Sequence, residues 1–113
     1  VALAEEVLND LMPQDAAPVD AQTIMDSSAR YFGITHDDLT GSSRVANIAS
    51  ARQIAMYLCR ELTDLSLPKI GAKFGGRDHS TVLHAVRKIS EKIGVDRALY
   101  TQVTELTNQI KQS

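Results

Sequence analysis

GGRDHSTVLHAVRKI, residues 75–89, is the stretch of sequence that decides the fold of this chain. Gly75 and Gly76 interrupt any preceding helix, and Asp78 is a candidate N-cap for the helix that follows. Apolar side chains then recur at intervals of three and four, the spacing of one buried helical face: Val82, Ala85, Val86, Ile89 and Ile93. The pattern predicts an amphipathic helix over residues 79–93.

A shorter helix is expected immediately before the two glycines. Ser66 can cap a helix and Pro68 is tolerated in a first turn, so residues 67–74 are predicted to be helical. Two helices of unequal length joined by a tight glycine turn are typical of a helix-turn-helix, whose second helix presents its N-terminal side chains to the major groove of DNA. DNA recognition is therefore the first function to weigh.

The rest of the compact part is also predicted to be helical. Asp20 can cap a helix that ends before Gly33, and a short helix is expected in THDDLTG, residues 35–41. Residues 47–63 contain no Gly or Pro and should form the longest and most central helix. The apolar positions of a last helix are Leu99, Val103, Leu106 and Ile110. Because no alternation typical of strands is found, the sequence predicts an all-α domain of about six helices.

The N-terminal residues show a different organisation. VALAEEVLNDLM has amphipathic helical spacing and stops at Pro13, which cannot continue a helix. PQDAAPV, with two prolines, reads as a linker. We expect residues 1–13 to be a connector helix, residues 14–19 a linker and residues 20–113 the compact domain.

Charge is distributed unevenly along the 113 residues, although the net charge is only −2. Residues 1–40 hold eight acids and one base, a net of −7, whereas residues 41–113 hold eleven bases and six acids, a net of +5. Affinity for a polyanion must therefore lie in the second part.

Cysteine usage and hydropathy favour a cytoplasmic protein. Cys59 is the only cysteine and cannot form an internal disulfide, which indicates a reducing compartment. No apolar run approaches the ~20 residues that a membrane span needs, and Glu5 and Glu6 stand where a signal peptide would have basic residues.

Polar side chains lie opposite the apolar stripe of the predicted helix 79–93, and Arg, His, Ser and Asp can each meet a base edge. This polar face consists of Arg77, Asp78, His79, Ser80, Thr81, His84, Arg87 and Lys88. Long cationic or polar side chains on other elements suit contacts to phosphates around one recognition helix: Arg44, Arg52, Gln53, Arg60, Lys69 and Lys73. For any one of these residues alone, a solvated surface charge is the commoner explanation.

Several segments in order resemble the DnaA family of bacterial replication initiators, in its C-terminal DNA-binding domain. GGRDHSTVLHAVRKI is similar to the family signature, and so are IMDSSARYFGI, DDLTG, ARQIAMYLCREL and SLPKIGAKF. The similarity covers roughly residues 20–93. It implies a helix-turn-helix of the Trp-repressor-like type that binds DnaA boxes of a replication origin.

The resemblance also implies roles for individual residues. Bases of the major groove would be contacted by Asp78, His79 and Ser80, with apolar contacts to thymine methyl groups from Leu67, Pro68 and Thr81. Arg44 would enter the adjacent minor groove. Phosphate contacts are expected from Arg52, Gln53, Arg60, Lys69, Arg77, Arg87 and Lys88. The family usually has Thr at the position of Ser80. Serine keeps the hydroxyl of threonine but lacks its methyl group.

Cofactors and partners follow from the same resemblance. Residues 1–12 resemble the helix that connects the family's ATPase domain to its DNA-binding domain, and no G-x-x-x-x-G-K-[ST] loop occurs in the chain. We therefore expect no ATP, other cofactor or metal in this chain, a monomer bound to double-stranded DNA, and contact with acidic phospholipids near the linker.

Three other functions compete with this hypothesis. An enzyme is disfavoured because Asp78, His79 and Ser80 are consecutive, and consecutive helical side chains point ~100° apart. A protein-interaction or membrane-surface module would use the acidic first forty residues, but residues 1–12 lack the basic side chains that bind acidic membranes. A dimeric helix-turn-helix regulator is the closest alternative, and the mass in solution distinguishes it from a monomer.

Overall fold

The computed structural model describes residues 19–112 and is entirely helical over that range. The helices are α2 (Ala21–Phe32), α3 (His36–Thr40), α4 (Ala46–Leu62), α5 (Leu67–Lys73), α6 (His79–Ile93) and α7 (Arg97–Lys111). These six helices of the described part confirm the predicted all-α helix-turn-helix. The expected connector helix and most of the expected linker, residues 1–18, lie outside the described residues.

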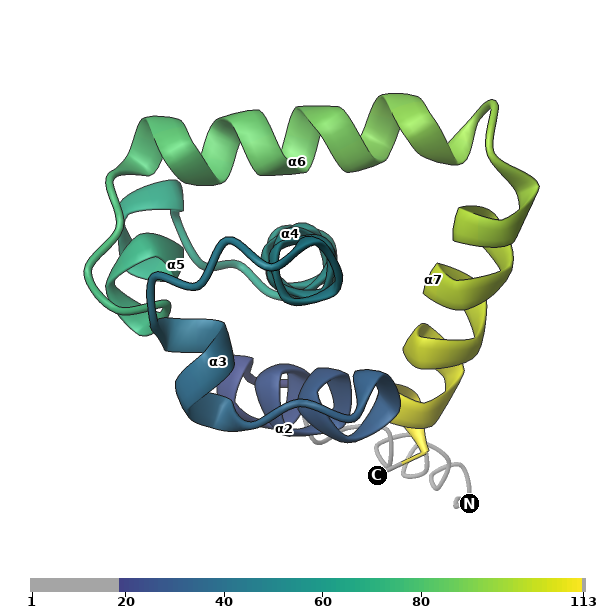
Figure 1. Ribbon diagram of the computed structural model, residues 1–113, viewed down its shortest axis with the longest axis horizontal. Helices are drawn as coiled ribbons and strands as arrows, with labels where there is room; N and C mark the ends of the chain where they lie inside the picture. The colour runs from purple at the N-terminus through teal and green to yellow at the C-terminus, as the bar shows by residue number, and fades with distance from the viewer. Residues whose placement is uncertain (1–18, 113) are drawn as a thin grey trace, which may run out of the picture.

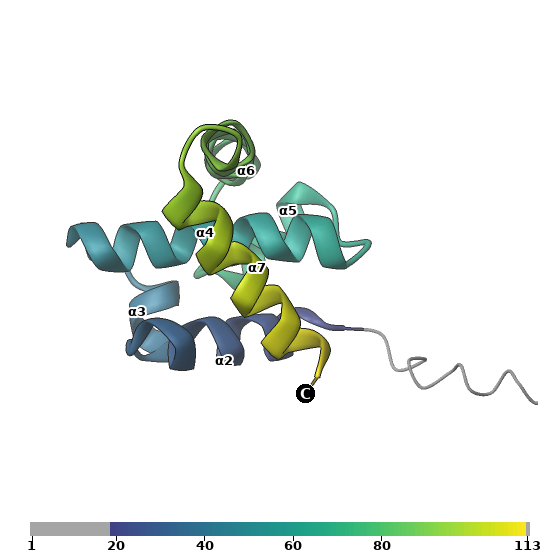
Figure 2. The ribbon, with the colours of Figure 1, turned by 90° about the vertical axis from the view of Figure 1, so that its right-hand side faces the viewer.

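α4 is the centre of the fold, and the other helices surround it. In Figure 1 it is seen end-on, with α6 above, α5 to the left, α2 and α3 below and α7 to the right. Figure 2 shows it from the side, running beneath α6 and passing behind α7. Its buried residues are Ala51, Arg52, Ile54, Ala55, Met56, Leu58 and Cys59, a wider set than a single stripe. A helix that is covered on several sides buries more of its circumference than a surface helix does.

Local capping determines where most of the helices begin. The Asp20 carboxylate accepts from the Thr23 backbone N–H at 2.8 Å, and the Asp78 carboxylate caps α6 in the same way. α3 begins with a reciprocal capping box, in which Thr35 and Asp38 each accept from the other's backbone N–H at 3.0 Å. These caps satisfy N–H groups that a helix leaves free in its first turn.

α7 closes the structure against the first helix. The Tyr31 hydroxyl donates to the Glu105 carboxylate at 2.6 Å, so α2 and α7 are joined although 74 residues separate the two side chains. Leu99, Val103, Leu106 and Ile110 are buried, as their spacing predicts. No helix within residues 19–112 is long and apolar enough to cross a membrane.

Candidate nucleic-acid interface

The turn between α5 and α6 is closely packed, and two glycines make it possible. The Gly71 carbonyl accepts from the backbone N–H groups of Phe74, Gly76 and Arg77 at 3.1, 3.1 and 2.8 Å. A Cβ on Gly71 would lie 2.1 Å from the Arg77 carbonyl oxygen. Gly75 has φ +86, and a Cβ there would lie 2.1 Å from the Thr40 carbonyl oxygen. The turn therefore fits directly against the end of α3, and this contact helps to determine where α6 begins.

The first turn of α6 is capped and exposed. The Asp78 carboxylate accepts from both the hydroxyl and the backbone N–H of Ser80, the latter at 3.0 Å, and these hydrogen bonds lower the pKa of Asp78 below its usual value. His79 Nδ1 lies 3.7 Å from an Asp78 carboxylate oxygen, and 62% of the His79 side chain is exposed. Asp78 thus already holds the helix start, whereas His79 projects into solvent.

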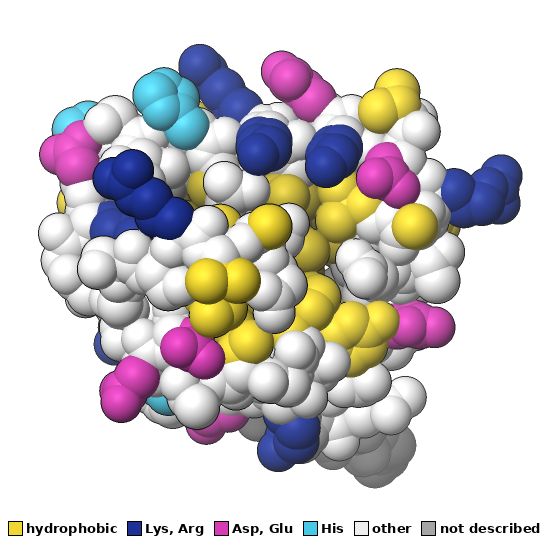
Figure 3. All heavy atoms as spheres, viewed as in Figure 1, with side chains coloured by type: hydrophobic (Ala, Val, Ile, Leu, Met, Phe, Trp, Pro, Cys, Tyr) yellow, Lys and Arg dark blue, Asp and Glu magenta, His cyan; other side chains and the backbone are white. Residues whose placement is uncertain are grey.

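Several of the predicted side chains meet in a shallow hollow between α4 and α6. Its volume is about 250 Å³. It is lined by Arg52, Gln53 and Met56 from α4, by Arg77, and by Thr81, His84, Ala85 and Lys88 from α6. The structure therefore brings Gln53, 28 residues earlier in the sequence, into the lining of the same hollow as Thr81. In Figure 3 His side chains and several Lys and Arg side chains gather over α6, in the upper half of this face, and a further His surface is visible at the lower left.

Arg44 lies in the Arg44 loop, residues 41–45, which connects α3 to α4. In Figure 1 this loop passes in front of the molecule from the side of α5 to the near end of α4. The Arg44 side chain is exposed, and the next residue, Val45, is 57% exposed. Arg44 thus stands on a different element from α6 and is available to a ligand.

Arg52 requires a correction of the sequence-based prediction. It was expected to contact phosphate, but only 8% of the residue is exposed. Its guanidinium donates to the carbonyl oxygens of Asp38, Leu39 and Ser43 at 2.7, 3.1 and 3.0 Å. Because its nitrogens are used inside the fold, we no longer assign Arg52 to the phosphate backbone.

Arg77 is corrected for the same reason. Its guanidinium donates to the carbonyl oxygens of Phe74 and Gly41, and to that of Thr40 at 3.3 Å. Partial burial, together with the nearby charge of Arg52, lowers the pKa of Arg77. Arg77 is therefore a structural contact between the α5–α6 turn and α3, and we also remove it from the phosphate-binding set.

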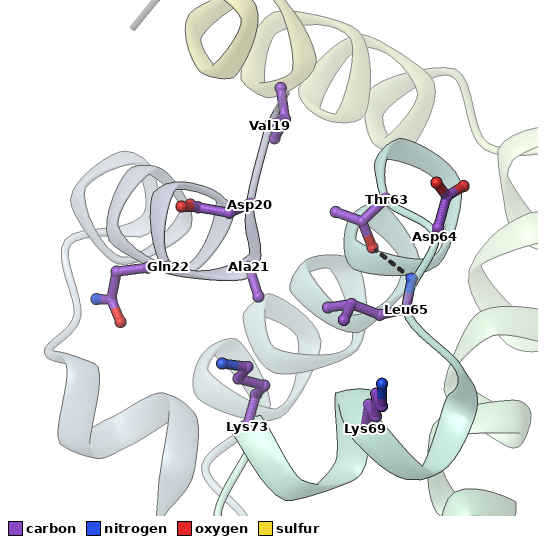
Figure 4. Close-up of a pocket in the computed structure, with 9 residues that line it drawn as sticks. All are labelled: Val19, Asp20, Ala21, Gln22, Thr63, Asp64, Leu65, Lys69 and Lys73. Carbon is purple, nitrogen blue, oxygen red and sulfur yellow. Dashed lines mark hydrogen bonds between the residues drawn. The ribbon is translucent and has the colours of Figure 1, made fainter. Parts of the chain in front are cut away.

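The predicted residues of α5 lie in two kinds of surroundings. Leu67 packs in part against the core, whereas Pro68 and Lys69 are exposed. Lys69 lines a separate hollow of about 430 Å³ between the start of α2 and the α4–α5 turn. Figure 4 shows Lys69 and Lys73 projecting from α5 toward this hollow, with Lys73 below Ala21 and Lys69 below Leu65. Lys69 is thus not part of the group formed by Gln53, Thr81 and Lys88.

Two residues to which the sequence assigned no DNA contact line the hollow between α4 and α6. His84 was placed on the polar face of α6 but given no DNA contact, and Met56 was not considered. The spacing of His84, three and four residues from Thr81 and Lys88, was the available signal for it. Nothing in the sequence distinguishes Met56 from the other core residues of α4. Over residues 19–112 no cluster of His, Cys, Asp and Glu could hold a metal ion.

The family model and the relatives that match this chain carry the same name. A family model described as the bacterial dnaA protein helix-turn-helix matches residues 21–89. The chromosomal replication initiator protein DnaA of Cutibacterium acnes is 58% identical over 113 residues, which cover 99% of this chain and 23% of that protein. The protein of the same name from Leifsonia xyli is 59% identical over 112 residues, covering 98% of this chain and 24% of its own length. The chain thus spans about a quarter of the length of these relatives.

Proposed function

Because this chain belongs to the bacterial DnaA helix-turn-helix family, we propose that it binds double-stranded DNA sequence-specifically at DnaA boxes of a replication origin, as part of a replication initiator. In this proposal α6 enters the major groove, and Arg44 enters the adjacent minor groove from the Arg44 loop. Residues 20–113 form the DNA-binding unit, and no ATP or other cofactor is needed for binding.

Individual residues take the following roles in the proposal. His79, Ser80 and Thr81 contact base edges from the first turn of α6, with Leu67 and Pro68 adding apolar contacts. Asp78 reaches a base only with the part of its carboxylate that the cap leaves free. The phosphate contacts are Gln53, Arg60, Lys69, Arg87 and Lys88.

The observation that best supports this function is the exposed, capped start of α6 beside basic and polar side chains of α4. Free backbone N–H groups at a helix start favour phosphate, while side chains of that turn project toward base edges. His79 is the most informative residue, because its imidazole can donate to a purine acceptor or a thymine oxygen and its exposure shows that it does not hold the core together.

The test compares binding of the domain to one DnaA-box duplex and to one scrambled duplex. His79→Ala should reduce affinity for the box by about ten- to hundredfold, the usual effect of losing one base contact, and should leave the scrambled duplex almost unaffected. The melting temperature should stay close to that of the unsubstituted domain.

His36→Ala provides a matched control, because His36 is also an exposed histidine at the first position of a helix, but in α3. It should bind both duplexes normally. If the folded His79→Ala variant keeps its full preference for the box, α6 is not the reading element.

We also propose that the domain binds as a monomer, one copy to each box. A helix-turn-helix with one recognition helix needs only one asymmetric half-site, whereas dimers need two sites about one helical turn apart. Sedimentation of the complex on a minimal box should give one protein per duplex, and a two-to-one complex would favour a dimeric regulator.

Contact with acidic phospholipids was expected near the linker, most of which lies outside the described residues.

A further inference from the structure

The carbonyl groups at the C-terminal end of α3 need hydrogen-bond donors from outside the helix. A helix leaves its last carbonyl groups without partners inside the helix, and α3 has only five residues. Arg52 from α4 supplies donors to Asp38, Leu39 and Ser43, and Arg77 supplies donors to Thr40 and Gly41. Two guanidinium groups therefore satisfy five carbonyl groups between residues 38 and 43.

The two arginines also connect elements that are distant in the sequence. Arg77 donates to Phe74 at the end of α5 as well as to Gly41, 36 residues earlier. Arg52 holds the carbonyl of Ser43, the residue immediately before Arg44. Burial and, after it, the positive charge of Arg52 lower the pKa of Arg77. Carbonyl dipoles at a helix C-terminus favour positive charge and offset the repulsion between the two cations.

From these contacts we propose that Arg52 and Arg77, the arginine clamp, are positioning residues that fix the Arg44 loop relative to the α5–α6 turn before DNA binds. The clamp acts through Arg44 and makes no DNA contact of its own. This inference rests on the proposed function, in which Arg44 and α6 address neighbouring grooves. A loop that is already ordered loses less conformational entropy on binding, so a preformed loop binds more tightly.

Arg52→Lys is the appropriate perturbation, because it keeps the charge but replaces a planar fork of donors with a single ammonium group. Lysine cannot reach three carbonyl groups in the arrangement that Arg52 uses. Arg97→Lys serves as the matched control, since Arg97 is exposed at the first position of α7 and makes no hydrogen bond to the Arg44 loop in the described structure.

The first readout is a double-mutant cycle on a DnaA-box duplex. We expect Arg52→Lys to weaken binding by about tenfold when Arg44 is present, and by less than about twofold in an Arg44→Ala background. Loss of stability alone would weaken binding equally in both backgrounds. An equal loss in the two backgrounds would therefore overturn the proposal.

The second readout uses no DNA. Trypsin cleaves after Arg44 when the loop opens and after Arg87 when α6 unfolds, so the two sites report local and global opening separately. Arg52→Lys should accelerate cleavage at Arg44 by about tenfold with little change at Arg87, and Arg97→Lys should change neither.

Equal acceleration at Arg44 and Arg87, or no acceleration, would show that Arg52 does not hold the loop. If the unsubstituted domain shows no preference for the box, the proposed function is wrong. Cleavage at Arg44 then still decides whether the arginines fix the loop.

Discussion

Gly75→Ala should lower the free energy of unfolding far more than Gly76→Ala does. Both residues have left-handed backbone angles, with φ +86 and φ +80, which cost a residue with a Cβ about 1–2 kcal/mol. A Cβ on Gly76 would meet nothing within 4 Å, whereas one on Gly75 would lie 2.1 Å from the Thr40 carbonyl oxygen. That oxygen also accepts from Arg77, so it is not free to move away.

The steric contribution can be estimated from a third glycine. Gly71→Ala adds no left-handed strain, but its Cβ would lie 2.1 Å from the Arg77 carbonyl oxygen. Overpacking of this kind typically costs about 1–3 kcal/mol and sometimes more. We therefore expect a loss of about 1–2 kcal/mol for Gly76→Ala, about 2–3 kcal/mol for Gly71→Ala and at least about 3 kcal/mol for Gly75→Ala. The last value is a large fraction of the ~5–15 kcal/mol by which typical domains are stable.

Urea unfolding followed by far-ultraviolet circular dichroism measures all three differences. The midpoints should decrease in the order Gly76→Ala, Gly71→Ala, Gly75→Ala. If Gly75→Ala is no less stable than Gly76→Ala, the α5–α6 turn does not pack against Thr40 as described. The contact with Thr40 would then not help to position α6.

Arg60→Ala should weaken specific and scrambled DNA alike and reduce the slope of log affinity against log salt by about one, whereas a loss confined to the box would contradict a phosphate contact. Hydrogen bonds lower the pKa of Asp20 and Asp78 below 3.8, so their stabilising contribution is complete above that pH and is lost as pH falls through the lower folded values. Thermal melts in acid should show this loss, and Asp78→Asn should reduce it. Burial raises the pKa of Cys59 to about 12, so a thiol reagent should modify it only as fast as the domain opens, and rapid modification of the native protein would contradict its burial.

The existence of the helices and most of their starts were determined by local sequence. Asp78 and the spacing of Val82, Ala85 and Ile89 predicted α6 over residues 79–93, and the structure has the same bounds. Asp20 and Ser66 act as the caps that their positions indicate. A cap, a proline or an apolar stripe acts within a few residues of itself, so the sequence contains all the information needed. The exposed start of α6 follows from the same signals.

Only the tertiary structure decided which groups the Arg52 and Arg77 side chains contact. Both are cations on helical or turn segments, and the sequence pattern placed them on a polar, DNA-facing side. The carbonyl groups that accept from Arg52 lie 9 to 14 residues away, and those of α3 and its end that accept from Arg77 lie 36 and 37 residues away. Every residue has a backbone carbonyl, so no sequence pattern marks the ones that packing leaves without a helical partner. Only when α3, α4 and the α5–α6 turn meet do these carbonyl groups gather around two guanidinium groups and turn predicted phosphate contacts into internal ones.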